Sequence, residues 1–237
     1  MLDLNTSEFS EAFFKNGAVL CFDKPLHWTS FQLVNKVRWL IRQTYNIKKI
    51  KVGHAGTLDP LATGLVIICT GKKTKTIPDL MGQHKVYTGE ITLGATRPSY
   101  DMETEIDAKF PYDQITEKQI HNNTREFTGN IMQRPPAFSA LKKEGKRLYE
   151  YARKGEAVDI PKREVHIYSF EITSVELPKV CFRVSCGKGT YIRSLAHDFG
   201  KSLFSGAYLS GLCRTQIGDF ELKDATSLEA FEEALRG

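Results

Sequence analysis

The chain has 237 residues, of which 41% are hydrophobic and 26% are charged, and its formal net charge at pH 7 is +5. This composition excludes a disordered tail and suffices for the core of one large domain, with or without an insertion. The sequence contains no run of about 18 apolar residues, the length needed to cross a bilayer. Its acidic N-terminus also lacks the basic and apolar parts of a secretion signal, so we expect a cytoplasmic protein. The five cysteines are scattered without a CxxC pair, which suggests neither a disulfide framework nor a zinc site.

The first third of the chain predicts a helix, a loop and a buried strand. A helix is expected to begin at Thr29 or Ser30, because the apolar residues that follow share one helical face: Leu33, Val34, Val37, Leu40 and Ile41. After the basic stretch "KKIKVGH" comes the loop "GTLDPLATG", and then "LVIICT" has the length and β-branched content of a buried strand. The loop therefore leads directly into the interior.

The remaining elements predict sheet and two further helices. Residues 84–101 read as a strand that closes in a turn, and residues 179–186 alternate with one apolar side: Val180, Phe182, Val184 and Cys186. The stretch "GTYIRSLAHDFGKSL" has apolar residues at helical spacing, with Gly200 and Lys201 near its end. In "TSLEAFEEALRG", Thr226 and Glu229 would form the capping box of a short helix. Without a regular βαβ rhythm, the class expected is α+β.

A single carboxylate, Asp59, lies in the tight loop, where Gly56, Pro60 and Gly64 restrict the backbone around it. One interpretation is a turn aspartate that bonds its own backbone, and the other is a functional acid. Nearby, His54 could be a structural histidine, a base or an aromatic plate.

Two further residues have an ordinary and a functional interpretation. Tyr87, in "KVYTGEITLG", would usually be a strand aromatic that fills the core, and Arg193, in "GTYIRSLAHD", would usually form a surface ion pair.

A basic segment spans residues 134–164, with nine Lys and Arg residues against five acids, a local charge of +4. Phe138, Tyr149 and Tyr151 are interleaved with these charges. The combination suits RNA phosphates and base stacking, and a solvated helical face is the alternative.

The joint order of these motifs resembles the TruB family of tRNA pseudouridine synthases, which isomerise uridine 55 in the T loop. The resemblance runs from about residue 18 to residue 220, and these pieces carry it: "DKPLHWTSF" (23–31), "GHAGTLDPLATGLV" (53–66), "KVYTGEITLGATRPSYD" (85–101), "QRPPAFSALKKEGKRLYEYARKGE" (133–156), "REVHIYSFEI" (163–172), "CGKGTYIRSLAHDFG" (186–200) and "LSGLCRTQIGDF" (209–220).

The resemblance implies the pseudouridine-synthase fold, a long, mixed and mainly antiparallel sheet with flanking helices and an RNA-binding cleft. It also implies a single catalytic domain over residues 1–237, without the C-terminal PUA domain of many bacterial relatives. Residues 134–164 would be the inserted RNA-binding thumb. The basic residues expected to bind substrate there are Lys142, Lys143, Lys146 and Arg147.

The resemblance also assigns roles at the site. Asp59 would be the nucleophilic carboxylate, Arg193 its charge partner, and Tyr87 the tyrosine that stacks on the target base and can move a proton. His54 would help to flip the base out of the T loop, and Lys24 is grouped with the substrate-binding residues as a structural lysine near the site. The partner implied is the T arm of tRNA, bound by a monomer that needs no cofactor, metal or membrane.

Rival functions can be stated from the same residues. A non-catalytic RNA-binding or RNA-folding module would have a decayed active loop, whereas Asp59, Tyr87 and Arg193 are all present. A hydrolase acting on nucleosides would need a second acid, which "GHAGTLDPLATG" does not offer. A synthase of the same fold acting on another RNA remains the main alternative.

Overall fold

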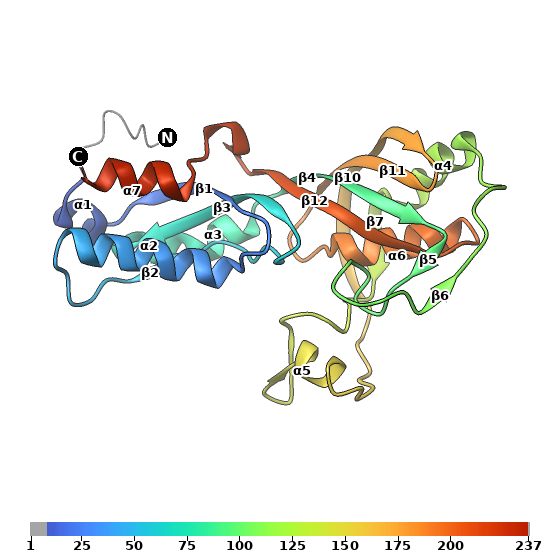
Figure 1. The fold of residues 1–237 in the computed structure, drawn as a ribbon, viewed down its shortest axis with the longest axis horizontal. Coiled ribbons are helices and arrows are strands. Elements are labelled where there is room, and N and C mark those ends of the chain that lie inside the picture. The colour runs from blue at the N-terminus through green and yellow to red at the C-terminus, as the bar shows by residue number, and fades with distance from the viewer. Residues whose placement is uncertain (1–8, 237) are drawn as a thin grey trace. The chain divides into compact units, whose positions relative to one another are not determined.

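The computed structural model describes residues 9–236. The chain forms two compact units: residues up to Val86 together with those from Cys213 onward make the first, and Tyr87–Leu212 make the second. Strands β4 (Lys85–Leu93) and β12 (Ala207–Ile217) contribute residues to both units (Figure 1).

Over the described residues, the main sheet has nine strands in the order β1-β3-β12-β4-β11-β10-β7, with β2 paired to β3 and β13 paired to β12. The β1–β3, β2–β3, β12–β13, β10–β11 and β10–β7 pairs are antiparallel, whereas β12 pairs with β3 in parallel. The predicted α+β class with a long, mixed and mainly antiparallel sheet is confirmed.

The first unit contains these elements besides its parts of β4 and β12: α1 (Glu11–Asn16), β1 (Val19–Lys24), α2 (Ser30–Thr44), β2 (Val52–His54), β3 (Thr63–Thr70), the 3₁₀ helix η1 (Gly71–Thr76), α3 (Ile77–Gly82), β13 (Phe220–Glu221), the 3₁₀ helix η3 (Leu222–Asp224) and α7 (Leu228–Arg236).

Helix α2 forms where its apolar spacing predicts it. Thr29 caps its N-terminus through a reciprocal capping box with Gln32, and the five apolar residues on its predicted face are all buried. These buried residues make α2 one wall of the first unit's core.

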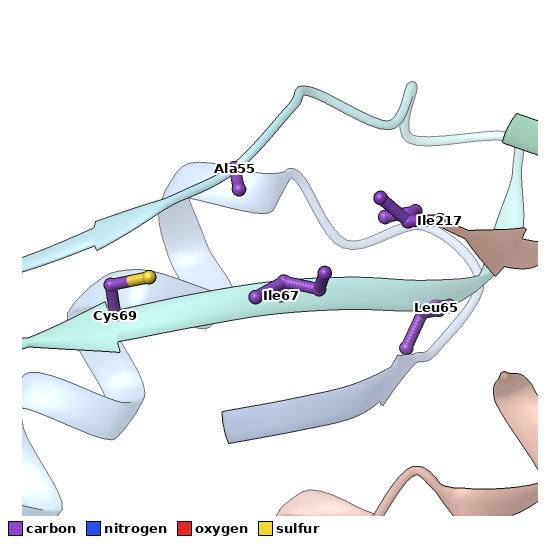
Figure 2. Packing of buried hydrophobic residues seen from close by; sticks show 5 residues of the cluster. All are labelled: Ala55, Leu65, Ile67, Cys69 and Ile217. Carbon is purple, nitrogen blue, oxygen red and sulfur yellow. The ribbon is translucent and has the colours of Figure 1, made fainter. Parts of the chain in front are cut away.

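Strand β3 is buried on both faces, which explains why its sequence is continuously apolar. On one face, Leu65, Ile67 and Cys69 form a cluster with Ala55 and Ile217 in which every member is fully buried (Figure 2). The loop that carries Asp59 therefore enters the centre of this unit.

The other face of β3 lies toward helix α7. Val66 is paired in register with Phe22 of β1, and the Phe22 ring meets the Phe231 ring of α7 edge-on, with centroids 5.2 Å apart. Side chains of one sheet face thus pack against the C-terminal helix.

The predicted cap of helix α7 is wrong by one residue. Ser227 takes the capping position: its Oγ accepts a hydrogen bond from the Ala230 amide at 3.1 Å, whereas the Thr226 hydroxyl is directed to the Ser227 carbonyl. The Thr226 backbone instead pairs with strand β1: its amide donates to the Cys21 carbonyl and its carbonyl accepts from the Asp23 amide. A long-range backbone pairing therefore displaces the cap.

The second unit contains, besides its parts of β4 and β12, these elements: β5 (Ala95–Thr96), β6 (Ala108–Lys109), α4 (Glu117–Asn123), the 3₁₀ helix η2 (Thr124–Phe127), β7 (Gly129–Gln133), β8 (Lys142–Lys143), β9 (Lys146–Arg147), α5 (Leu148–Ala152), β10 (Arg163–Glu176), β11 (Lys179–Cys186) and α6 (Ile192–Ser202).

Helix α6 covers the apolar face of β10 and β11. The ring of Phe199 lies 5.3 Å from that of Phe170, which in turn lies 5.8 Å from that of Phe182. The alternation predicted for β11 is confirmed, since the residues on its apolar side are all buried. Because α6 is fixed by this aromatic contact, the residues of its first turn have a defined position in the second unit.

Candidate active site

The lone acid lies in a backbone turn that glycine makes accessible. Gly56 and Gly64, which flank Asp59, have φ angles of +114° and +103°, in the region that side chains other than glycine rarely adopt. A Cβ on Gly64 would lie 2.4 Å from the Arg214 carbonyl oxygen, so only glycine allows β12 to approach at this point. The predicted restriction of the loop by these glycines is confirmed.

The backbone around Asp59 is also held from helix α2 and the segment before it. Ser30 Oγ accepts a hydrogen bond from the Leu58 amide at 2.8 Å and donates one to the Leu58 carbonyl at 3.1 Å. The His27 amide donates to the Pro60 carbonyl at 2.8 Å. The residues immediately before and after Asp59 are therefore both fixed from outside the loop.

Arg214 of β12 completes the attachment, and sequence reasoning missed it. Its side chain is 1% exposed and donates to three backbone carbonyls: those of Leu65 at 2.7 Å, Gly56 at 3.2 Å and Thr57 at 3.3 Å. The available signal was an arginine in the otherwise apolar and neutral stretch "LSGLCRTQIG". The partners, about 150 residues earlier in the chain, could not be read from that signal.

We expect Arg214→Met to lower the free energy of unfolding by about 3 kcal/mol, because it leaves several buried carbonyl groups without donors and each such group costs about 1–3 kcal/mol. Chemical denaturation measures this loss, and hydrogen exchange should show faster exchange of the Leu58 amide. The matched control is Arg125→Met at an exposed position, which should change stability by about 0.5 kcal/mol or less. An unchanged unfolding free energy for Arg214→Met would contradict this account of the loop.

Lys24, the last residue of β1, is fully buried. Its amine donates to the carbonyls of Pro25 at 2.9 Å and Trp28 at 2.6 Å. Its pKa is lowered to about 8, mainly by burial; the charge of Asp59 opposes this shift and that of Arg214 adds to it. This geometry supports the structural role expected of Lys24.

His54 ends strand β2 and is half-buried. Burial lowers the pKa of its imidazole, and Arg214 adds to this by electrostatic repulsion of the protonated form. The histidine is therefore neutral at neutral pH, which suits an aromatic plate better than a cation.

Tyr87 and Arg193 belong to the second unit. Tyr87 lies on β4 and is 9% exposed. Its side chain is therefore largely enclosed, as expected of an aromatic residue on a buried strand. Arg193, the second residue of α6, is 5% exposed. The expectation of a surface ion pair is wrong for Arg193, because the sequence does not reveal that segments far from α6 enclose its first turn.

The Arg193 guanidinium has defined partners within its unit. Its NH1 group donates to the carbonyls of Phe138 at 2.9 Å and Ser99 at 3.2 Å, and its Nε lies 3.6 Å from Oδ2 of Asp101, which is 6% exposed. Sequence reasoning did not identify Asp101, the last residue of the motif "TRPSYD". Arg193 and Asp101 thus form a buried ion pair rather than a solvated one.

Gln133, the last residue of β7, and Arg134, the first residue of the basic segment, hold the N-terminus of α6. The Gln133 side chain accepts from the Tyr191 amide at 2.8 Å and donates to the Tyr191 carbonyl at 3.1 Å, and Ser194 Oγ donates to the Arg134 carbonyl at 2.8 Å. The basic segment and the Arg193 site are consequently joined through the same few residues.

The basic segment departs from the main sheet after β7 and returns at β10 (Figure 1). Four of its exposed cations occupy a short hairpin, in which Lys142 pairs with Arg147 and Lys143 with Lys146 across a turn with positive φ at Glu144 and Gly145. The alternative of a solvated helical face is wrong for these four residues, since the only helix between β7 and β10 is the five-residue α5 that follows them.

Aromatic side chains accompany the hairpin cations. The Lys146 amine lies 5.9 Å from the Tyr151 ring centroid, and Tyr149 has the guanidinium groups of Arg147 and Arg153 at 5.8 and 5.2 Å. For Tyr149 and Tyr151, the interleaving inferred from the sequence is therefore confirmed as cation–π contacts.

The structure brings the predicted residues together in two groups, one in each unit. Asp59, His54 and Lys24 surround the loop of the first unit, whereas Arg193, Tyr87 and the hairpin belong to the second. The approach of Arg193 and Tyr87 to Asp59 remains a prediction. In the part of the chain that is described, no three His, Cys, Asp or Glu side chains converge as metal ligands, and none of its helices is long and apolar enough to span a membrane.

Comparison with known proteins gives a consistent result. Residues 42–192 match the family model described as TruB family pseudouridylate synthase (N terminal domain). The protein of Flavobacterium johnsoniae named tRNA pseudouridine synthase B is 57% identical over 93% of this chain and 96% of its own length. The protein of the same name from Phocaeicola vulgatus is 53% identical over 94% of both chains.

Solved structures resemble this chain as well. A chain in the crystal structure of a Cbf5-Nop10-Gar1 complex matches with a TM-score of 0.67 and 29% identity over 93% of this chain. A chain of an H/ACA RNP bound to a substrate RNA containing 2'-deoxyuridine matches with a TM-score of 0.66 and 28% identity. This chain spans 60% and 53% of the length of those two chains. The family model covers most of the chain and the curated relatives cover nearly all of it, so the chain belongs to the TruB family of pseudouridylate synthases.

Proposed function

We propose that this chain is a tRNA pseudouridine synthase that isomerises uridine 55 in the T loop. The observation that carries the proposal is the 57% identity, over nearly the whole of both chains, to a relative named tRNA pseudouridine synthase B. The fixed loop around Asp59 supports it, because such a loop can present one carboxylate in a defined position.

The reaction needs neither redox chemistry nor an energy source. The N1–C1′ glycosidic bond breaks, the uracil rotates while it remains bound, and a C5–C1′ bond forms on the same ribose. The proton lost from C5 is balanced by the proton that N1 carries in the product. The enzyme must therefore stabilise the separated base and sugar and exclude water while the base turns.

Asp59 would act on the sugar, either as a nucleophile at C1′ or by stabilising positive charge there in an elimination pathway. The carbonyls of its neighbours are already bonded to Arg214, Ser30 and His27, so the loop need not reorganise during the reaction. A carboxylate preorganised in this way stabilises developing charge better than a mobile one.

Arg193, Tyr87 and His54 would complete the site. Arg193 would keep Asp59 ionised after RNA closes the site, and Tyr87 would stack on the target base and move a proton during rearrangement. His54, neutral because its pKa is lowered, would help to flip the target base out of the T loop.

The hairpin at Lys142–Arg147 would contact phosphates of the T arm. Neutralising Lys142, Lys143, Lys146 and Arg147 to glutamine is expected to reduce the slope of log affinity for tRNA against log salt by up to about 3, since each lost phosphate contact removes about 0.7–0.9. The single-turnover rate on bound RNA should change by about threefold or less.

The matched control neutralises four exposed lysines outside the segment: Lys109, Lys118, Lys179 and Lys223. Their loss removes the same charge and should leave the salt slope within about 1 of the parent value. An unchanged slope for the hairpin variant, or an equal change in both variants, would place the RNA contacts elsewhere.

The experiment for the function itself is chemical mapping of pseudouridine in cellular RNA with and without this protein. The proposal predicts loss of the T-loop signal in tRNA alone. Loss at a site in another RNA, with the tRNA signal intact, would favour a synthase with a different substrate. An unchanged map would favour a non-catalytic RNA-binding or RNA-folding role.

Other parts of the proposal rest on the sequence and on the resemblance. These are the RNA-binding cleft, the single catalytic domain over residues 1–237, the monomeric state, the cytoplasmic location and the reaction without cofactor or metal.

A further inference from the structure

The segment Ser99–Asp101 meets helix α6 with residues on both sides of Tyr100. The Ser99 carbonyl accepts from the Arg193 NH1 group at 3.2 Å, and the Asp101 carboxylate lies 3.6 Å from the Arg193 Nε. Ser99 is fully buried and Asp101 is 6% exposed. Two of the oxygens around the Arg193 guanidinium therefore depend on the conformation of one short segment.

Tyr100 itself has a φ angle of +63°. This left-handed conformation is rare for a bulky residue. Its ring lies flat on the imidazole of His197, with centroids 3.8 Å apart and planes 13° from parallel, and His197 is 7% exposed. The unusual backbone angle thus places an aromatic ring on a buried histidine.

Helix α6 contacts the segment at two points of the same face. Arg193 and His197 are four residues apart, a spacing that brings side chains to one face of a helix. Arg193 binds Ser99 and Asp101, while His197 binds the ring between them.

The left-handed conformation at Tyr100 needs support from its surroundings, because strained residues persist only where several contacts fix them. Two backbone bonds contribute: the Tyr100 amide donates to Arg97 at 3.0 Å, and its carbonyl accepts from Leu209 at 2.9 Å. Bonds between Ser99 and Thr104, and between the Glu103 amide and Asp101 Oδ1, hold the two residues beside it. The ring stack holds the side chain.

We propose that the stacked pair Tyr100 and His197 positions Arg193, by holding Ser99 and Asp101 in contact with its guanidinium. The proposal rests on the proposed function, in which Arg193 acts beside Asp59. Tyr100 and His197 touch neither the RNA nor the reacting atoms in this account, so both are positioning residues.

The charge state of His197 is compatible with this role. Burial lowers its pKa to about 4, with Lys201 one turn further along α6 adding to the shift and Asp107 opposing it. At neutral pH the stack therefore joins two uncharged aromatic rings and buries no charge.

A filler of the core would behave differently from a positioning pair. Leucine occupies a similar volume to histidine but has no flat ring, whereas phenylalanine keeps the ring. The informative variants are therefore His197→Leu with its control His197→Phe, and Tyr100→Leu with its control Tyr100→Phe.

The test measures single-turnover rates of pseudouridine formation and dissociation constants for tRNA with the full chain. The phenylalanine variants should stay within about threefold of the parent rate. The leucine variants should lose tenfold or more, with dissociation constants within twofold of the parent, because RNA binding does not involve the pair. Leucine variants with the parent rate would overturn the proposal.

A double substitution distinguishes action through Arg193 from a general structural effect. In an Arg193→Lys background, His197→Leu should cause little further loss, because the arginine that it positions is already absent. Multiplicative losses of the two substitutions would show that His197 acts independently and would also overturn the proposal.

Tyr100→Gly protects the test against a failure to fold. Glycine adopts a φ of +63° without strain, so the native backbone stays accessible, but it adopts negative φ angles about as readily, so without the ring nothing holds the segment in this one conformation. It should fold and lose rate like Tyr100→Leu.

Hydrogen exchange provides a readout that does not depend on activity. The amide of Glu103, which donates to Asp101 Oδ1 at 3.0 Å, and the amide of Leu209 should exchange faster in the leucine and glycine variants and not in the phenylalanine variants. Equal protection in all variants would contradict the positioning role even if the parent protein formed no pseudouridine. An inactive parent protein would by itself count only against the proposed function.

Discussion

Asp59→Asn is expected to fold normally, to bind tRNA as the parent protein does, and to lose pseudouridine formation by at least about 10³-fold. The asparagine side chain has the same shape but neither the charge nor the nucleophilic oxygen that the sugar chemistry requires. The loop should remain intact, because it is attached through backbone atoms of Leu58, Pro60 and Gly56.

The measurement is the single-turnover rate on a T-arm transcript, together with the dissociation constant and the unfolding free energy. Asp79→Asn, an exposed acid in the first turn of α3, is the matched control and should keep the parent rate. Multiple turnover by Asp59→Asn would exclude Asp59 as the essential carboxylate.

Arg193→Lys should reduce the single-turnover rate by about 100-fold or more, although the net charge is unchanged. The guanidinium reaches the carbonyls of Ser99 and Phe138 through one nitrogen and lies beside Asp101 through another. A lysine ammonium is a single point charge and cannot reproduce this fork.

The same assay with Arg125→Lys, an exposed arginine of the second unit, controls for the substitution. This control should keep the parent rate. If Arg193→Lys also kept it, Arg193 would have only a structural role, and its proposed pairing with Asp59 would be wrong.

Elements with a strong local pattern could be predicted from the sequence. The five apolar residues of α2, the continuous apolar run of β3 and the alternation of β11 each reflect burial by one or two neighbouring layers, and all three are confirmed. In these cases the spacing of the apolar residues follows directly from which faces of the element are packed.

Features that depend on distant partners could not be predicted. Ser227 rather than Thr226 caps α7 because Thr226 pairs with β1, about 200 residues earlier in the chain. The burial of Arg193 could not be predicted either, because its sequence neighbours do not show the enclosing segments at Ser99 and Phe138.

The candidate site shows the same division. The glycines around Asp59 were identified because their conformational demand is local, whereas Arg214 and Asp101 were missed because their partners lie in other elements. The roles of Asp59, Tyr87 and Arg193 came from the resemblance, since a lone acid in a turn has an ordinary explanation as well.

The most direct test of the central claim uses the purified chain and an unmodified tRNA transcript in buffer with a metal chelator. Mass spectrometry and chemical mapping then report where pseudouridine forms. The account predicts close to one pseudouridine per tRNA, at uridine 55, with the parent protein, and none with Asp59→Asn at equal bound RNA. No pseudouridine with the parent protein, or equal amounts with both proteins, would contradict it.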